Sequence, residues 1–341
     1  MEFLYLSQED VVASGGLDMP AAIRDVELAF RLHNAGDSVL PSKTVLRWGD
    51  ARSEKTRGRI NAMPGYLGGS IRLAGLKWIS SIPSNPVERN LPRAHGLIIL
   101  TDVQTGVPLS VMDGTLISAV RTGAVTALAA QYLARSDATT VCMFGGGVQG
   151  RAQLLALAAV LPRLSEVRVY DPIHQRAQGL ADEISRRLGL RAVTASSPEE
   201  ACVGADVVVT ATTSSEPIIQ ERWLASGAFY AQCGGNECDD DTILKADYVV
   251  VDDWKEISHR GIYTVGLMVD KGLIGKDRVD AELGEIVTGQ KVGRTKSSQR
   301  IVFSSVGLVL EDVAVAARIY RTAVEKGLGQ RLELWKQPVW V

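Results

Sequence analysis

A short apolar run that ends in closely spaced glycines is the feature that most restricts how this chain folds. Residues 139–150 read TTVCMFGGGVQG, and Gly145, Gly147 and Gly150 fit the pattern G-x-G-x-x-G. In such a pattern the first glycine permits a tight strand-to-helix turn, the second lets the backbone approach a pyrophosphate, and the third lets the helix pack closely on the strand. We interpret the segment as the phosphate-binding turn of a dinucleotide site, with a purely structural glycine turn as the alternative.

A second strand-like run supplies the acidic partner that this turn needs. Residues 166–171 read EVRVYD and end in Asp171, which lies 21 residues beyond Gly150. A carboxylate at this place can accept hydrogen bonds from the ribose hydroxyls of NAD, and its charge disfavours the 2′-phosphate of NADP. The predicted cofactor is therefore NAD. The candidate cofactor-binding residues are Gly145, Gly147, Val148, Gln149, Gly150, Asp171, Thr212, Thr122 and Ser305.

Length, charge and cysteine content narrow the class of protein. The chain has 341 residues, which favours two domains, and a formal net charge of -2, which argues against nucleic-acid binding. No apolar run approaches the roughly 20 residues that span a bilayer, and the first residues lack a signal-peptide pattern. The cysteines lack the spacing of a metal site, so we expect no metal, reduced thiols and a cytoplasmic protein. They are Cys142, Cys202, Cys233 and Cys238.

The first 120 residues alternate short strand-like runs with glycine and proline turns. A helix is predicted over 18–36, with Asp18 as its N-cap and Pro20 in its first turn. A hairpin turn is predicted at 101–106. Strands are predicted at 45–48, 59–64, 76–80, 96–102 and 108–114. These elements indicate an antiparallel or mixed sheet.

From about Arg121 the pattern changes to strands and helices in alternation. An alanine-rich helix is predicted to begin at Arg121. Strands are predicted at 139–144, 166–170, 193–196, 205–212, 228–233 and 247–253, and helices at 149–160 and 174–188. This alternation is typical of a doubly wound parallel sheet, so the predicted fold class is α/β, with a Rossmann sheet and a mixed α+β domain.

A strongly patterned helix is predicted near the end of the chain, over 309–326, and Gly327 is placed to end it. We expect this helix to pack on the N-terminal part. The predicted domains are therefore a substrate and dimerisation domain of residues 1–120 and 310–341, and an NAD domain of residues 121–309. The polar segment 291–300 between the last predicted elements is expected to be a mobile loop.

Basic residues of the first domain are candidates for contact with a substrate. Lys77 sits in an apolar strand, where its amine needs a cleft or a partner; the alternative is an edge-strand lysine that reaches water. Arg121 opens a predicted helix, where the dipole disfavours a cation, so a bound carboxylate or phosphate would explain it; the alternative is a surface arginine. Of the remaining cations, we keep Lys43 and Arg93 as candidates and expect at least half to be surface charges.

The loop after the strand at 228–233 reads CGGNECDDD and is expected at the carboxyl edge of the sheet, where ligands bind. Asn236 and Glu237 are candidates for contact with a reacting nitrogen or a water molecule, with a polar turn as the alternative. Residues 239–241 are expected to cap a helix rather than to bind a metal. The scattered histidines do not indicate a histidine-driven dehydrogenase, which favours amine or imine chemistry steered by lysine and arginine.

Together these segments resemble the ornithine cyclodeaminase/mu-crystallin family over nearly the whole chain. The marks are RINAMPGYLGG, GLKW, SVMDGTLISAVRTGAVTALAAQYLA, FGGGVQG, VVVTATTSSEPII, AELGEIVTG and VFSSVGLVLEDVAVA. The resemblance implies an NAD-binding Rossmann domain joined to a substrate domain built from both termini, and a homodimer whose interface the strands of 96–112 can supply. It also implies that Lys77 and Arg121 hold a substrate carboxylate and that Lys43 assists.

Two features of the sequence bear on the substrate: one difference from the cyclodeaminases and one resemblance to a particular subgroup of the family. Cyclodeaminases carry an acidic residue where this chain has Asn236, and an amide cannot accept a proton, which argues against ornithine cyclisation. The stretch KWISSIPSNPVERNLPRAHGLIILTD resembles the subgroup that oxidises a secondary amine with several carboxylates, using NAD, for siderophores and peptide antibiotics. Its products are 2,3-diaminopropionate and 2-oxoglutarate. Lys77 is the first candidate base and Glu237 the second.

Three alternatives stay open from the sequence. The first is an ornithine or lysine cyclodeaminase, which recycles NAD and releases ammonia. The second is another amino-acid or imine dehydrogenase on the same scaffold. The third is a ligand-binding protein that keeps the cofactor site without turnover. The presence of both Lys77 and Arg121 argues against the last alternative.

Overall fold

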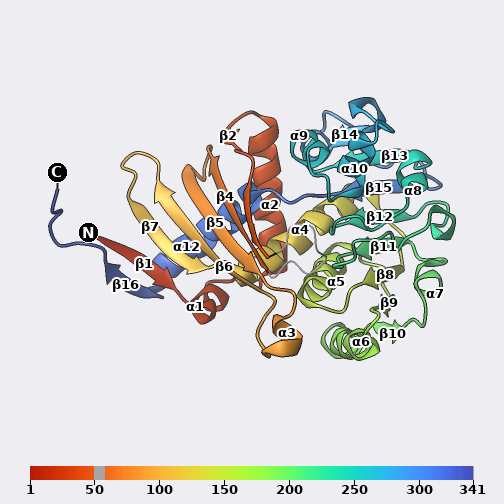
Figure 1. Ribbon diagram of the computed structural model, residues 1–341, viewed down its shortest axis with the longest axis horizontal. Helices are drawn as coiled ribbons and strands as arrows, with labels where there is room; N and C mark the ends of the chain where they lie inside the picture. The colour runs from red at the N-terminus through yellow and green to blue at the C-terminus, as the bar shows by residue number, and fades with distance from the viewer. Residues whose placement is uncertain (50–57, 341) are drawn as a thin grey trace. The chain divides into compact units, whose positions relative to one another are not determined.

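The computed structural model describes residues 1–49 and 58–340, which divide into two compact units (Figure 1). Unit 1 comprises Met1–Arg121 and Leu308–Val341, and unit 2 comprises Thr122–Gly307. Unit 1 is therefore assembled from two segments of the sequence, whereas unit 2 is continuous. Among the described residues, no helix combines the length and the apolar character needed to cross a membrane.

Unit 1 is built on a mixed sheet, which confirms the predicted sheet type. Its described strands follow the order β16-β1-β7-β6-β5-β4-β2, with β3 paired to β4 outside this path. They are β1 (Glu2–Leu6), β2 (Ser38–Val39), β3 (Thr44–Trp48), β4 (Gly58–Leu67), β5 (Leu73–Ser81), β6 (Ala94–Asp102), β7 (Pro108–Asp113) and β16 (Gln330–Glu333). Neighbours from β3 to β7 are antiparallel, whereas β1 runs parallel to β7. The sequence analysis missed β1, β2 and β16.

Helices cover one face of this sheet. They are α1 (Gln8–Ala13), α2 (Met19–Asn34) and α12 (Val309–Lys326), whereas α3 (Asn85–Glu88) lies in the connection between β5 and β6. Val309 and Val313 of α12 lie against Gly65 and Gly75, where the absence of side chains lets the helix approach the strands. The predicted packing of α12 on the N-terminal part is confirmed. Near the end of the helix the contact is less complete, and Val324 is 47% exposed.

The opposite face of the sheet carries large apolar side chains. Leu46, Trp78 and Leu97 are 58%, 37% and 41% exposed. Trp78 and Leu97 are direct partners in the β5–β6 register, and side chains alternate between the two faces of a strand. Lys77 therefore points to the face covered by α12, and its neighbour Trp78 points to the other face.

Helix α4 (Thr115–Leu133) begins six residues before the predicted start at Arg121. The Asp113 carboxylate accepts hydrogen bonds from the backbone N–H groups of Thr115 and Leu116, both at 3.1 Å, and so stabilises the first turn. The prediction was wrong because residues 115–120 belong to the helix, and Asp113, the last residue of β7, also stabilises its start. Arg121 lies in the second turn, so the argument from the helix dipole does not apply to it.

Unit 2 contains a parallel sheet with helices between its strands, which confirms the predicted α/β doubly wound fold. The strand order in this range is β10-β9-β8-β11-β12-β15-β13-β14. The strands are β8 (Thr140–Phe144), β9 (Glu166–Tyr170), β10 (Arg191–Thr194), β11 (Val207–Thr210), β12 (Phe229–Gln232), β13 (Tyr248–Val251), β14 (Ala281–Glu282) and β15 (Ile301–Ser304). The helices are α5 (Val148–Val160), α6 (His174–Leu188), α7 (Pro198–Cys202), α8 (Asp240–Leu244), α9 (Trp254–Ser258), α10 (Thr264–Asp270) and α11 (Leu283–Val287). Strand β15, which the sequence analysis missed, lies fully buried between β12 and β13.

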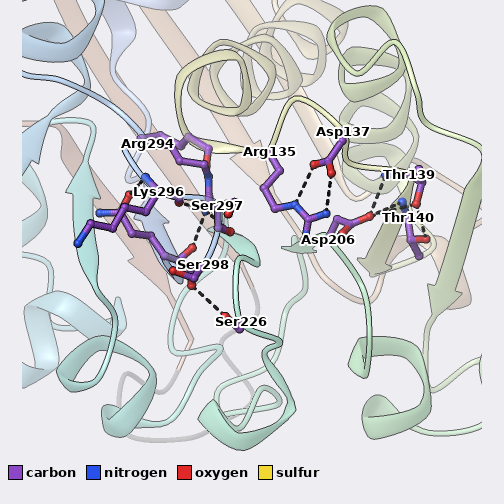
Figure 2. Close-up of polar contacts among 12 residues, drawn as sticks. Arg135, Asp137, Thr139, Thr140, Asp206, Ser226, Arg294, Lys296, Ser297 and Ser298 are labelled. Atoms are coloured by element: carbon purple, nitrogen blue, oxygen red, sulfur yellow. Dashed lines mark hydrogen bonds and ion pairs between the residues drawn. The ribbon is translucent and has the colours of Figure 1, made fainter.

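Hydrogen bonds and ion pairs connect the segments at the amino-terminal edge of this sheet (Figure 2). Asp206 accepts hydrogen bonds from the backbone N–H groups of Thr139 and Thr140, at 2.8 and 3.1 Å. Arg294 donates to the carbonyl of Leu133 at 2.8 Å and to that of Gln299 at 2.6 Å, and so ties down the segment 291–300. Because ligands of such sheets bind at the carboxyl edge, we assign these contacts to structure.

Candidate functional site

The glycine turn after β8 has the backbone geometry that a phosphate site requires. Gly145 has a φ of +107°, a conformation that strongly favours glycine. A Cβ atom at Gly150 would lie 2.0 Å from the carbonyl oxygen of Gly145, so only glycine lets α5 pack here. A Cβ atom at Gly147 would meet no atom of the described residues within 4 Å. Gly147 therefore leaves its backbone accessible to a ligand.

The first turn of α5 has donors for an anion. Its N-cap is Gly147, which has no side chain to accept hydrogen bonds from the first turn. Backbone N–H groups at such a helix start, together with the helix dipole, attract phosphate groups. Val148 is 59% exposed at this end, and the buried Oε1 atom of Gln149 has no hydrogen-bond partner among the described residues. The turn therefore fits the pyrophosphate of a dinucleotide.

Asp171 follows β9, the strand next to β8, and braces the glycine turn. One carboxylate oxygen accepts a hydrogen bond from the Gly146 N–H at 2.9 Å, and the other accepts one from the Ile173 N–H at 2.9 Å. Each carboxylate oxygen can accept a further hydrogen bond. The bracing role therefore leaves capacity for a ribose hydroxyl, and ribose binding by Asp171 stays a prediction.

Glu237 is fully buried and joins two loops at the carboxyl edge of the sheet. It accepts hydrogen bonds from the N–H and hydroxyl of Thr212, at 2.6 and 2.7 Å, and from the Gly234 N–H at 2.8 Å. Burial raises the pKa of the Glu237 carboxyl, while these hydrogen bonds lower it. The geometry favours a role in positioning the loops over the predicted role as a base.

The remaining candidates of unit 2 also lie in hydrogen-bonded positions. The Asn236 amide donates to the Ser215 carbonyl at 3.4 Å, and its oxygen accepts from the Thr264 hydroxyl at 3.3 Å. The Ser305 N–H donates to the Gln232 carbonyl at 3.0 Å. The carbonyl of Thr122 in α4 accepts from the Gln153 side chain at 3.3 Å. Asp239 is the N-cap of α8, which confirms the capping role predicted for this acidic turn.

Lys77 of unit 1 lies in the central strand β5 and is 1% exposed. Its Nζ atom lies 2.5 Å from a carboxylate oxygen of Asp312 and 3.5 Å from the Ser118 hydroxyl. Burial, and next the charge of Arg121, lower the pKa of Lys77 to about 8, although Asp312 opposes this shift. The alternative of an edge-strand lysine that reaches water is wrong, because β5 is paired on both sides.

Arg121 contacts the same part of α12. Its guanidinium donates a hydrogen bond to Glu311, and its Nε atom lies 3.3 Å from Asp312. Both acids are 1% exposed, and burial raises the pKa of the Glu311 carboxyl while Arg121 lowers it. Lys77, Arg121, Glu311 and Asp312 therefore form a buried cluster of balanced charge, which we call the ion cluster.

The sequence analysis missed Glu311 and Asp312. A signal was present, since the segment LVLEDVAVA places two adjacent acids inside an otherwise apolar helix. Buried charges in such a position need partners. The sequence analysis predicts a cleft or a partner for Lys77 and a bound carboxylate or phosphate for Arg121, but it names no acidic residue of the chain as the partner of either.

The other predicted cations of unit 1 lie in the segments before β3 and β6. Lys43 directly precedes β3 and is half-buried. Arg93 directly precedes β6, beside the end of β5, where its carbonyl accepts a hydrogen bond from the Ile82 N–H at 2.8 Å. Arg89 is exposed and pairs with Glu88 at 2.8 Å, and His95 is exposed.

Unit 2 thus has the sheet, glycine turn and acidic residue of a Rossmann-type dinucleotide-binding protein, and unit 1 contains the buried ion cluster. The profile of the ornithine cyclodeaminase/mu-crystallin family matches residues 3–327, and the chain belongs to this family, as predicted.

Several proteins that are similar over nearly their full length are named as dehydrogenases or reductases. The N-((2S)-2-amino-2-carboxyethyl)-L-glutamate dehydrogenase of Staphylococcus aureus is 33% identical over 98% of this chain and 99% of its own length. The Delta(1)-pyrroline-2-carboxylate reductase of Thermococcus litoralis, solved with NADH and L-proline, has a TM-score of 0.89 and 34% identity, over 96% of this chain and 99% of that one. An archaeal alanine dehydrogenase dimer with bound NAD has a TM-score of 0.88 and 35% identity, over 98% of this chain and 100% of that one.

Proposed function

We propose that this protein is an NAD-dependent oxidoreductase that acts on the CH–NH bond of an amino-acid-like substrate. The observation that carries this proposal is the buried Lys77, whose pKa of about 8 lets it exchange a proton near neutral pH beside Arg121. The proposed substrate is N-(2-amino-2-carboxyethyl)-L-glutamate, and the products are L-2,3-diaminopropionate and 2-oxoglutarate. The full-length similarity to the staphylococcal dehydrogenase supports this choice. The setting that we propose for the reaction is siderophore or peptide natural-product biosynthesis.

The residues of unit 2 fit NAD. In our proposal the open backbone at Gly147 and the first turn of α5 hold the pyrophosphate, and Asp171 accepts hydrogen bonds from the ribose. When bound, NAD supplies the hydride acceptor. Glu237 keeps the loops at Thr212 and Gly234 in place, because it bonds to both.

The residues of unit 1 bind the substrate and move its proton. Arg121 orients a substrate carboxylate, and neutral Lys77 takes the proton from the substrate nitrogen as hydride leaves Cα, which produces an imine. Asp312 stabilises the ammonium that Lys77 becomes. Water then adds to the imine carbon and the C–N bond breaks, which gives the keto acid and the primary amine.

The test is a turnover assay of the purified protein with NAD and the proposed substrate, beside L-alanine, L-proline and L-ornithine. We expect NADH absorbance and one 2-oxoglutarate per NADH with the proposed substrate. Ammonia without NADH would instead indicate a cyclodeaminase, and turnover of L-alanine or L-proline alone would indicate the simpler dehydrogenases. Lys77→Met is expected to lower kcat by about 10²- to 10⁴-fold and to leave NAD binding unchanged.

We further propose that the protein is a homodimer. The face of the unit 1 sheet that carries Leu46, Trp78 and Leu97 is apolar and exposed, as is usual for surfaces that bind another chain. A second copy can cover the same strands by two-fold symmetry. The dimer in the similar alanine dehydrogenase structure supports this proposal.

A further inference from the structure

Two arginines meet at one end of the unit 1 sheet. Arg59 of β4 lies opposite Ser81 of β5, and Ser81 lies opposite Ala94 of β6. Arg93 directly precedes Ala94, and its backbone bonds to Ile82 just after β5. Arg59 and Arg93 therefore flank the end of β5 from its two sides.

One hydrogen-bond donor of the Arg93 side chain, the Nε atom, is buried without an acceptor among the described residues. Burial, and next the charge of Arg59, lower the pKa of Arg93, and no described acid acts in the opposite direction. Two neighbouring positive charges and a buried unpaired donor are both relieved by a bound anion, and a carboxylate can accept two hydrogen bonds from a guanidinium.

The register of β4 places Arg59 in line with Lys77, and Arg93 lies near enough to Arg59 for their charges to interact. Lys77 lies opposite Met63, and Arg59 lies four residues from Met63 along β4. Alternate residues share one face of a strand, so Arg59 and Lys77 face the same side, with backbones about 14 Å apart along the strands. Lysine and arginine side chains are long, so the distance between their charged ends can be shorter than the distance between the backbones.

Asn61 lies between the two positions on the same face, opposite Ile79. Its Oδ1 atom is buried and has no hydrogen-bond partner among the described residues. A buried acceptor without a donor is unfavourable in the free protein. A substrate with an N–H group between two carboxylates supplies the missing donor.

We propose that Arg59 and Arg93 form a second carboxylate subsite, which binds the distal carboxylate of a substrate held at its other end near Lys77 and Arg121, while Asn61 accepts a hydrogen bond from the substrate nitrogen. This inference rests on the proposed function and selects dicarboxylate amines over monocarboxylate amino acids. Alanine or proline leaves the arginine pair without an anion.

The kinetic test compares two substrates that differ only at the distal group. One is N-(2-amino-2-carboxyethyl)-L-glutamate, and the other is its L-glutamine analogue, in which a neutral amide replaces the carboxylate. We expect Arg93→Gln and Arg59→Gln to raise KM for the acid by about 10- to 100-fold and to change KM for the amide little. Arg93→Lys keeps the charge and is expected to recover part of the loss.

Arg89→Gln is the matched control, because Arg89 is exposed, lies four residues from Arg93 and pairs with Glu88. It is expected to change neither KM. Thermal unfolding checks that each variant folds; if Arg93→Gln does not, Arg59→Gln and Arg93→Lys carry the comparison. Equal losses for acid and amide would overturn the subsite.

A binding measurement separates failure of the subsite from failure of the proposed function. Calorimetry with the NADH-loaded protein compares 2-oxoglutarate with 2-oxobutyrate, a keto acid that lacks the distal carboxylate. We expect the wild type to prefer 2-oxoglutarate and Arg93→Gln to lose that preference. If the wild type prefers 2-oxoglutarate, Arg93→Gln loses this preference and neither amine is oxidised, the proposed reaction is wrong and the subsite is supported. If the wild type shows no preference, the subsite is wrong.

Discussion

At the scale of single residues, the protonation of Lys77 depends on opposing neighbours. Burial and Arg121 favour the neutral amine, whereas Asp312 favours the ammonium. A lysine in this setting serves as a base only when it is neutral, so amine oxidation is expected to increase as the pH rises through about 8. The neighbours therefore set the pH range of activity as well as the geometry.

Substitution of either neighbour is expected to shift the pKa of Lys77 in a known direction. Asp312→Asn removes a charge that raises this pKa, so the rising limb of kcat/KM against pH is expected to move to lower pH. Arg121→Gln removes a charge that lowers it, so the limb is expected to move to higher pH. Asp240→Asn, which alters a surface pair with Lys271, is the control and is expected to leave the limb in place. Shifts of Asp312→Asn and Arg121→Gln in the same direction would contradict the assignment.

At the scale of elements, local signals predicted more than long-range pairing did. The helix start at Asp18, the helix end at Gly327 and the glycine turn depend on neighbouring residues, and their geometry in the structure follows these patterns. Strand β15 was missed because it is short and follows a polar loop. The hydrogen bond between Lys77 and Asp312 joins positions 235 residues apart, so no local sequence pattern predicts it.

Two glycines of the α5 turn are expected to respond differently to the same substitution. Gly150→Ala places a methyl group against the Gly145 carbonyl and is expected to destabilise the fold by about 1–3 kcal/mol. Gly147→Ala meets open space and is expected to keep the stability nearly unchanged while it lowers the affinity for NAD. Urea unfolding and calorimetry with NAD measure the two effects. Normal NAD affinity in Gly147→Ala would contradict the placement of the pyrophosphate.

The start of α4 offers a test of the corrected helix boundary. Asp113→Ala removes the acceptor for two backbone N–H groups, and the expected loss of stability is about 1 kcal/mol. Urea unfolding measures this loss, and Asp182→Ala on the exposed side of α6 serves as the control. An unchanged midpoint in Asp113→Ala would argue for a helix that begins at Arg121.

At the scale of the whole molecule, the exposed apolar sheet face determines the proposed assembly. Leu97→Glu puts a charge into this face and is expected to convert the dimer to a monomer of 36.7 kDa. Light scattering after size-exclusion chromatography measures the mass. Val292→Glu, at a 69% exposed position in unit 2, is the control and is expected to remain dimeric. A dimeric Leu97→Glu protein would move the interface elsewhere.

The assembly of unit 1 from two separated segments has a consequence for synthesis in the cell. The ribosome makes the partners Lys77 and Arg121 long before Glu311 and Asp312, with the 186 residues of unit 2, Thr122–Gly307, in between. At typical elongation rates this delay is about 10–40 s. During that interval α12 does not yet cover the strands of unit 1. We expect chaperones that recognise uncovered strands to bind the nascent chain mainly in this period.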